Sequence, residues 1–371
     1  MKLLIITQRV HRSDENLGAF YYWFVGLAAR FEEVVIIADA AGESVHLPAN
    51  MTVVTLGKEK GAGRLRRLWR FWELFSYYYA RTDAVFFHMI PEFVLAAAPF
   101  LVSLRRPSFL WYAHGAVSRR LAWAERLVDF ILTSSAGGFR LPSKKVLYLG
   151  QAVNTDLFHL RGQDTEAPGR PLRMISIGRI APVKDYETII RACKLLDAAG
   201  DVEWRLTIVG GPILPRDHDY YSRLKNLVAG AGLEKKIIFV GPRGYEEIPS
   251  LLAEHDLFLN ASRTGSLDKA VLEAMATGLT VITANDAYRT VVPAAYFLEH
   301  PSAEFLAARI KKLAREPRPN RALRDIVLAH HSLAHTVERL GALIEGEVRK
   351  PRGIGRNLPA GGQVLLSDKR L

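Results

Sequence analysis

The sequence predicts an α/β protein with two Rossmann-like, doubly wound parallel sheets, and three observations carry this prediction. The chain has 371 residues, 49% of them hydrophobic, which is enough for two cores and long for one domain. Short apolar runs alternate with amphipathic stretches, as in parallel sheets with helices on both faces. This alternation restarts after a polar connector at 154–169, so each half is expected to form its own sheet.

The apolar runs give the expected strands in chain order. In the first half they are 3–7, 34–38, 53–56, 84–88, 109–113, 130–133 and 146–149, and in the second half 174–177, 205–209, 237–240, 257–260 and 281–283. Helix-like segments fill the gaps between them. Ligands of such sheets bind beyond the carboxyl ends of the strands, so two halves that face each other would enclose a cleft.

The segment 262–278, SRTGSLDKAVLEAMATG, links the last two expected strands through a turn and a helix. Gly265 and Ser266 suit the turn, and Ser266 or Asp268 can cap the helix. A strand, loop, helix and strand in this order place the helix N-terminus at the carboxyl ends of the strands, where amides and the helix dipole favour an anion. The dipole contributes only about 0.3–1 kcal/mol, so a diphosphate would also need cationic side chains.

An earlier strand end supplies candidates for those cations. The strand near 174–177 ends in Gly178-Arg179, and a helix is expected to start near Asp185 with Lys184 at its N-terminal end. Solvated charges at a helix end are the alternative interpretation of Arg179 and Lys184.

Four segments in the same order resemble the donor-binding half of retaining glycosyltransferases of family 4, within glycosyl transferases group 1. They are GRIAPVKDYETIIRACKLL, LTIVGGP, IIFVGPRG and SRTGSLDKAVLEAMATG. Residues 16–18, 112–115 and 149–158 resemble the family more loosely, and the resemblance extends over 1–346. It implies the two-domain B-type (GT-B) fold, a nucleotide diphosphate sugar such as a UDP-sugar as donor, and catalysis without a cofactor or metal.

The resemblance also implies roles for individual residues. Arg179 and Lys184 would stabilise the leaving diphosphate, for which charge-assisted hydrogen bonds of about 1.5–3 kcal/mol each are suited. Glu273 matches the second Glu of the family's pair and would bind the ribose hydroxyls; a favourable position in the helix dipole is its alternative role. His114 would contact the donor sugar, or else be a histidine satisfied at the edge of a core.

Further donor-binding candidates are glycines and turn residues along the same segments. Gly18 opens the first helix and would let the backbone approach a phosphate. Arg243 is expected near the nucleotide. The set is Gly18, Gly178, Gly210, Arg243, Thr264, Gly265, Ser266, Leu267, Asp268 and Lys269.

One position departs from the family pattern. Gly265 stands where the family has the first Glu of its pair, and Asp268-Lys269 stands where small or apolar residues are usual. We therefore hypothesise that Asp268 or its neighbouring amides contact the donor sugar. The same departure motivates an alternative, a catalytically weakened homologue that serves as a nucleotide-binding or scaffold subunit.

Other chemistries find less support. Asp217-His218-Asp219 is interpreted as a surface loop, because two hard-oxygen ligands without further carboxylates make a poor metal site. The eleven histidines show no zinc-type spacing with the single Cys193. An NAD-type oxidoreductase is disfavoured, since no Gly-x-Gly-x-x-Gly follows the first strand.

The net charge of +12 suggests two kinds of anionic partner, nucleic acid and an anionic membrane. Nucleic acid is disfavoured as a partner because no binding motif accompanies the basic residues. Residues 58–70 hold six cations and precede an aromatic run to Tyr79, consistent with an interfacial helix on an anionic membrane or with a helix that buries its aromatics. At helical spacing one side is expected to carry Leu65, Leu68, Trp69, Trp72, Phe75 and Tyr79.

These observations lead to expectations for the location, the domains and the reaction of the protein. It would be cytoplasmic, with a peripheral position on the inner membrane face as a hypothesis, since no run reaches the ~18 apolar residues of a span. The expected parts are an acceptor domain (1–160), a donor domain (161–330), a terminal helix crossing back (331–348) and a basic flexible tail (349–371). The implied reaction moves a hexose or N-acetylhexosamine to a glycan or lipid-linked acceptor in cell-surface polysaccharide or glycolipid synthesis.

Overall fold

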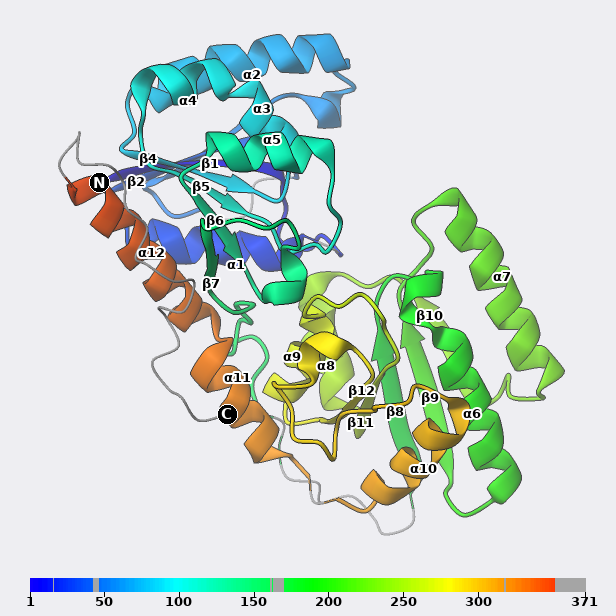
Figure 1. The fold of residues 1–371 in the computed structure, drawn as a ribbon. Coiled ribbons are helices and arrows are strands. Elements are labelled where there is room, and N and C mark those ends of the chain that lie inside the picture. Colours follow the sequence, from blue (N-terminus) through cyan, green and yellow to red (C-terminus); the bar gives the residue numbers. More distant parts are fainter. Residues whose placement is uncertain (16, 43–46, 161, 163–169, 317, 351–371) are drawn as a thin grey trace. The chain divides into compact units, whose positions relative to one another are not determined.

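The structure, a computed structural model, describes residues 1–15, 17–42, 47–160, 162, 170–316 and 318–350 (Figure 1). The chain divides into two compact units. The first contains residues 1–152 and the C-terminal segment that begins at Leu333, and the second contains residues 153–332. The strands of both sheets pair in parallel, so the predicted fold class is confirmed.

The first unit is built on a seven-stranded sheet in the order β3-β2-β1-β4-β5-β6-β7. Its inner strands contain continuous buried runs, such as residues 3–7, because helices cover both faces of the sheet. The strands are β1 (Lys2–Val10), β2 (Glu33–Ala41), β3 (Met51–Thr55), β4 (Ala84–His88), β5 (Ser108–Trp111), β6 (Phe130–Thr133) and β7 (Val146–Tyr148).

The side chains of β1 alternate between two cores, one on each face of the sheet. Leu3 and Ile5 pack with α1 (Gly18–Ala28) and α12 (Leu333–Arg349), so the last helix completes the core of the first unit. Leu4 and Ile6 belong to the core on the other face. That face is covered by α2 (Arg64–Tyr79), α3 (Pro91–Ala96), α4 (Ala98–Leu104) and α5 (Arg119–Leu127) (Figure 1).

The second unit has a five-stranded sheet in the order β10-β9-β8-β11-β12. Its strands are β8 (Leu172–Ile177), β9 (Trp204–Val209), β10 (Ile237–Gly241), β11 (Leu257–Asn260) and β12 (Thr280–Thr283). Its helices are α6 (Tyr186–Ala199), α7 (Pro215–Gly230), α8 (Ile248–Ala253), α9 (Lys269–Ala276), α10 (Ala303–Leu313) and α11 (Arg321–His330).

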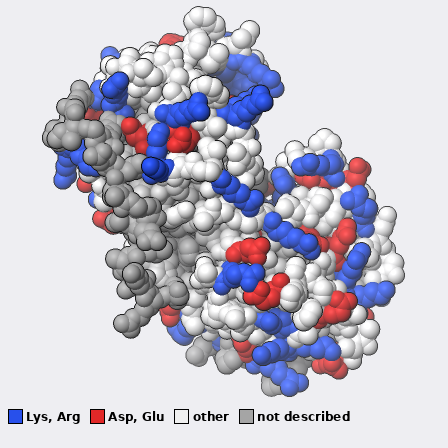
Figure 2. Space-filling model, in the orientation of Figure 1, with Lys and Arg blue, Asp and Glu red and all other residues white. Residues whose placement is uncertain are grey.

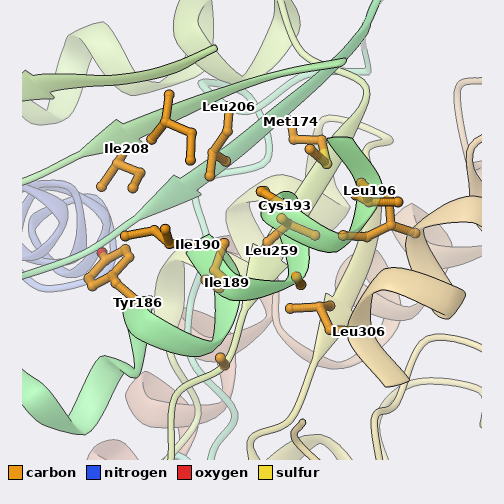
Figure 3. Close-up of a cluster of buried hydrophobic side chains, with 14 of the residues drawn as sticks. Met174, Tyr186, Ile189, Ile190, Cys193, Leu196, Leu206, Ile208, Leu259 and Leu306 are labelled. Atoms are coloured by element: carbon orange, nitrogen blue, oxygen red, sulfur yellow. The ribbon is translucent and has the colours of Figure 1, made fainter. Parts of the chain in front are cut away.

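Helix α6 provides much of the apolar contact beneath this second sheet. Ile189, Ile190 and Cys193 lie against Leu206 and Ile208 of β9 in the core shown in Figure 3. The Cys193 thiol is free and fully buried, and burial raises its pKa well above the ordinary value. It therefore packs as a small apolar side chain.

Each expected strand coincides with a strand of the structure, with ends that differ by a few residues. Part of the polar connector (161 and 163–169) and nearly all of the tail (351–371) lie outside the described residues. No helix among the described residues has both the length and the apolar composition needed to cross a membrane.

The prediction of which residues form the buried apolar side of 64–79 is wrong in part. Phe71, Phe75 and Tyr79 of α2 are buried in the first unit, whereas Leu65 and Trp69 are 76% and 71% exposed. Two apolar stripes therefore run along this helix, and the one that contacts the sheet begins at Phe71. Lys and Arg side chains gather near the N-terminal end of α2 (Figure 2).

Candidate functional site

The carboxyl ends of β8 and β9 meet at two glycines of the predicted site. Gly210 has a φ of +134°, and a Cβ there would lie 2.0 Å from the carbonyl oxygen of Gly178. The Gly178 amide donates to the Val209 carbonyl at 3.0 Å, and the Gly178 carbonyl accepts from the Tyr186 hydroxyl at 2.9 Å. Only glycine fits at position 210, because both its backbone angle and its close neighbour exclude a side chain.

The two predicted cations follow directly on this strand end. Arg179 is partly exposed, and its Nε lies 3.8 Å from Oδ2 of Asp217. Lys184 ends a short 3-10 turn (Pro182–Lys184), and its Nζ donates to Oδ1 of Asp268 at 2.7 Å. Asp185 then caps α6 by accepting from the Thr188 amide, so the predicted helix start is confirmed.

Asp268 is the centre of a polar network at the start of α9. Its Oδ2 accepts from Nδ2 of Asn260 at 3.1 Å and from Nδ2 of Asn285 at 3.4 Å. The Tyr288 hydroxyl donates to its backbone carbonyl at 2.6 Å. Burial raises the pKa of the Asp268 carboxyl, but the charge and hydrogen bond of Lys184 outweigh burial and hold the pKa below its ordinary value.

The turn before α9 is tied to the same network. Gly265 has a φ of +67°, which glycine adopts without strain. Asn285 donates to Oγ1 of Thr264 at 3.1 Å and to the carbonyl of Ser266 at 2.8 Å. Leu267 is buried beneath the turn. The predicted turn residues Thr264 and Ser266 are thus connected through Asn285, and Asp268 is the helix N-cap without a capping bond from its side chain.

Lys269 and Glu273 follow one turn apart on α9. Burial lowers the pKa of Lys269 to about 8, although the Glu273 charge opposes the shift. Burial raises the pKa of Glu273 to about 7, although the Lys269 charge and a hydrogen bond from Tyr245 oppose it. Oε1 of Glu273 is buried and has no hydrogen-bond partner among the residues that the structure describes. A buried carboxyl oxygen of this kind is available to a hydroxyl donor.

The remaining candidates are more isolated. Arg243 is exposed and follows β10 by two residues. Gly18 and His114 belong to the first unit: Gly18 is buried at the start of α1, where its amide donates to the Asp14 carbonyl at 2.9 Å. His114 is exposed beyond the end of β5, and its Nδ1 accepts from the Ala116 amide at 3.1 Å.

The interpretation of Asp217-His218-Asp219 as a surface loop is wrong. These residues lie within the first five positions of α7 (Pro215–Gly230), and Asp217 is fully buried. Oδ2 of Asp217 accepts from the Leu214 amide at 3.1 Å, as an acidic residue in a first helical turn can. Pro215 is the signal that could have revealed this helix start, because proline suits the first helical position.

The structure thus groups the predicted residues of the second unit by direct contact. Lys184 meets Asp268, Thr264 and Ser266 share Asn285, and Gly178 meets Gly210. Sequence reasoning missed three participants, Asp217, Asn260 and Asn285. Within the described ranges, no group of three or more His, Cys, Asp or Glu side chains could hold a metal ion.

The arrangement of strand ends, cations and helix N-terminus lies within a segment that matches a known family. Residues 162–326 match the model of the family described as Glycosyl transferases group 1. The chain carries a group 1 glycosyltransferase domain. The resemblance found in the sequence is confirmed at this level, whereas membership of family 4 and retention of configuration stay predictions.

Curated relatives of the group 1 domain match only part of their own length. WcaL of Salmonella typhimurium, named a colanic acid biosynthesis glycosyltransferase, is 31% identical over 174 residues, which are 44% of this chain and 41% of that protein. AmsK of Erwinia amylovora, named an amylovoran biosynthesis glycosyltransferase, is 31% identical over 38% of this chain and 34% of its own. The matches therefore span less than half of these relatives.

A solved structure resembles more of the chain. HepE of Anabaena, crystallised with UDP and glucose, has a TM-score of 0.73 over 93% of this chain and 100% of its own. The sequence identity is 16%, so this likeness shows the fold alone. That fold is the pair of parallel-sheet units expected for a B-type glycosyltransferase.

Proposed function

We propose that the protein transfers a hexose or N-acetylhexosamine from a nucleotide diphosphate sugar to a glycan or lipid-linked glycan, with retention of configuration and without a metal. The observation that carries this proposal is the group 1 domain in which Arg179 and Lys184 flank the glycine-lined ends of β8 and β9. The similarity to WcaL and AmsK, named for colanic acid and amylovoran biosynthesis, favours cell-surface polysaccharide synthesis. The ligands of HepE favour a UDP-sugar as donor.

The chemistry of the leaving group explains why these side chains suit the reaction. The nucleotide diphosphate sugar already carries two negative charges, and heterolytic cleavage of the bond to the anomeric carbon adds a third to the departing nucleoside diphosphate. Arg179 and Lys184 would stabilise that charge through hydrogen bonds of about 1.5–3 kcal/mol each. The N-terminal end of α9, which begins after Asp268, would add the positive end of the helix dipole.

Burial of Glu273 fits a role in nucleotide binding. Its unpartnered Oε1 could accept a ribose hydroxyl, and burial lets a single hydrogen bond discriminate strongly against a ligand that lacks it. His114, at the end of a strand in the first unit, is proposed to contact the donor sugar.

A nucleotide-binding subunit without transferase activity is the second candidate, and Gly265 is the observation that favours it. Its side chain cannot supply the carboxylate that the family pattern has at this position. The distinction is one of turnover: both proteins would bind a nucleoside diphosphate, but only the enzyme would consume a nucleotide sugar.

A thermal-shift panel with UDP, GDP, ADP and their sugars tests the proposal first. Ligand at 100 times its Kd stabilises the folded state by about 2.7 kcal/mol, which raises the Tm measurably. Lys184→Ala should abolish the shift, whereas Lys194→Ala on the exposed side of α6 should keep it. Release of nucleoside diphosphate from the stabilising sugar then separates enzyme from subunit, and a chain that no nucleotide stabilises would refute both candidates.

We also propose an anionic lipid bilayer as a partner of the first unit. Leu65 and Trp69 are exposed on α2 beside Arg66 and Arg70, and Trp123 is 58% exposed on α5, which covers the same face of the sheet. Apolar side chains can enter the interface while each cation near an anionic surface adds about 1 kcal/mol. Such binding would hold the protein at the inner face of the cell membrane, next to a lipid-linked acceptor.

Vesicle sedimentation tests the membrane proposal. The protein should pellet with phosphatidylglycerol vesicles at low salt and remain in the supernatant with phosphatidylcholine vesicles, because the attraction depends on lipid charge. Equal behaviour with both lipids, or no binding to either, would rule the proposal out.

A further inference from the structure

We propose that Asp217 is a positioning residue: it holds the guanidinium of Arg179 in the orientation that binds the diphosphate. This inference rests on the proposed function, because it assigns a role to a residue beside the proposed diphosphate site. It concerns an aspartate that the sequence pattern placed in a surface loop and that the structure places in the interior of the second unit.

The surroundings of Asp217 are unusual for a residue that only caps a helix. It is fully buried, and Oδ2 already accepts the Leu214 amide at 3.1 Å. Oδ1 is also buried and has no hydrogen-bond partner within the described part of the chain. A capping role needs one oxygen and tolerates exposure to water, so it does not account for a second enclosed oxygen.

The guanidinium of Arg179 forms an ion pair with this carboxylate. Its Nε lies 3.8 Å from Oδ2, and Oδ1 is left without a hydrogen-bond partner among the described residues. A small rotation of the long Arg179 side chain would bring both carboxylate oxygens within reach of the planar guanidinium, which prefers such paired contacts. Removing Arg179 would leave the buried Asp217 carboxylate without its cation, so the folded protein should be less stable when the cation alone is lost.

A paired contact through Nε and one terminal nitrogen leaves the other edge of the Arg179 guanidinium for the ligand. A guanidinium has five N–H donors in a fixed plane, and one edge can bind Asp217 while another binds phosphate oxygens. An unrestrained arginine would lose rotamer entropy on binding the ligand. Asp217 removes part of this loss before the donor arrives, which should strengthen donor binding.

Asp217→Asn is the decisive variant, because asparagine keeps the size and the capping oxygen but not the charge. We expect the folded protein to keep a Tm close to that of the wild type, while the Kd for the stabilising nucleoside diphosphate, measured by calorimetry, rises on the order of tenfold. Asp219→Asn is the matched control, since Asp219 is exposed in the same helical turn and its loss should leave the Kd unchanged.

A double-mutant cycle separates positioning from a general effect of charge. In an Arg179→Ala background, Asp217→Asn should change the Kd by less than about twofold, because there is no guanidinium left to position. Independent of ligand, Arg179→Ala alone should lower the Tm by leaving Asp217 buried without its cation, and adding Asp217→Asn should restore it.

Each other result overturns the inference. An Asp217→Asn protein that binds the diphosphate as wild type does, additive effects in the cycle, or failure of Asp217→Asn to fold would assign Asp217 a purely structural role. Failure of the wild-type protein to bind any nucleoside diphosphate would instead refute the proposed function and this inference with it. The two failures are therefore distinguishable by the wild-type titration.

Discussion

Nζ of Lys184 lies 2.7 Å from Oδ1 of Asp268, so the lysine that is proposed to bind the diphosphate already has an anionic partner within its own unit. The other carboxylate oxygen is held by Asn260 and Asn285, which fixes the position of the pair. A bound diphosphate would have to share Lys184 with Asp268. The carboxylate therefore both orients the lysine and repels the ligand.

Asp268→Asn separates these two effects. Loss of the negative charge should tighten binding of the free nucleoside diphosphate severalfold, on the order of 1 kcal/mol, while kcat falls because Lys184 is no longer held in place. Calorimetry and a turnover assay measure the two quantities. Asp286→Asn, which changes an exposed carboxylate near the same network, should alter neither. Weaker binding by Asp268→Asn would contradict the predicted repulsion.

Burial of Glu273 predicts a pH dependence of stability. The pKa rises from an ordinary 4.5 to about 7 in the folded protein, so folding favours the protonated carboxyl. Stability from this group is fully present below about pH 4.5 and is lost as the pH rises through about 7. Glu273→Gln removes that loss.

The Tm of Glu273→Gln relative to wild type should therefore increase between about pH 5 and about pH 8. Scanning calorimetry at both pH values measures the difference, and Glu254→Gln on the exposed end of α8 should give a constant offset. A parallel pair of Tm curves for Glu273→Gln and wild type would show that the buried carboxyl titrates normally.

The close approach of Gly210 to Gly178 predicts a large cost for any side chain. Gly210→Ala places a Cβ 2.0 Å from a backbone oxygen at a φ of +134°, so unfolding free energy should fall by more than about 3 kcal/mol. Gly230→Ala in α7, where a Cβ meets nothing within 4 Å, should stabilise the protein by about 0.5 kcal/mol. Urea denaturation compares both; a small loss at position 210 would mean that the strand ends can separate.

The strands were predictable from the sequence because burial on both faces leaves continuous apolar runs, as at 34–38 and 257–260. Asp217 was misjudged because Pro212 and Pro215 suggest a loop, although Pro215 opens a helix. The roles of Asn260 and Asn285 were hidden, since their contacts with Asp268 arise only when three separate segments meet. Such tertiary contacts leave no periodic signal.

Helix α2 shows a further reason for failure. Residues 71, 75 and 79 repeat at helical spacing, and so do 65, 68, 69 and 72. Periodicity alone does not say which stripe faces the sheet when both are apolar. The structure buries the first stripe and exposes most of the second, so the first stripe contributes to stability and the second is the one that we propose to contact lipid.

Two substitutions in α2 should therefore affect different properties, one the stability of the fold and the other vesicle binding. Phe75→Ala removes a fully buried ring stacked against Phe71 and Tyr79, and should lower the unfolding free energy by about 3–5 kcal/mol. Trp69→Ala changes an exposed ring and should alter stability by no more than about 0.5 kcal/mol, while binding to phosphatidylglycerol vesicles weakens severalfold. Phe305→Ala, also exposed but in the second unit, should leave vesicle binding unchanged. Equal vesicle binding by Trp69→Ala and wild type would place the lipid contact elsewhere, because an interfacial tryptophan loses its apolar contact area when truncated.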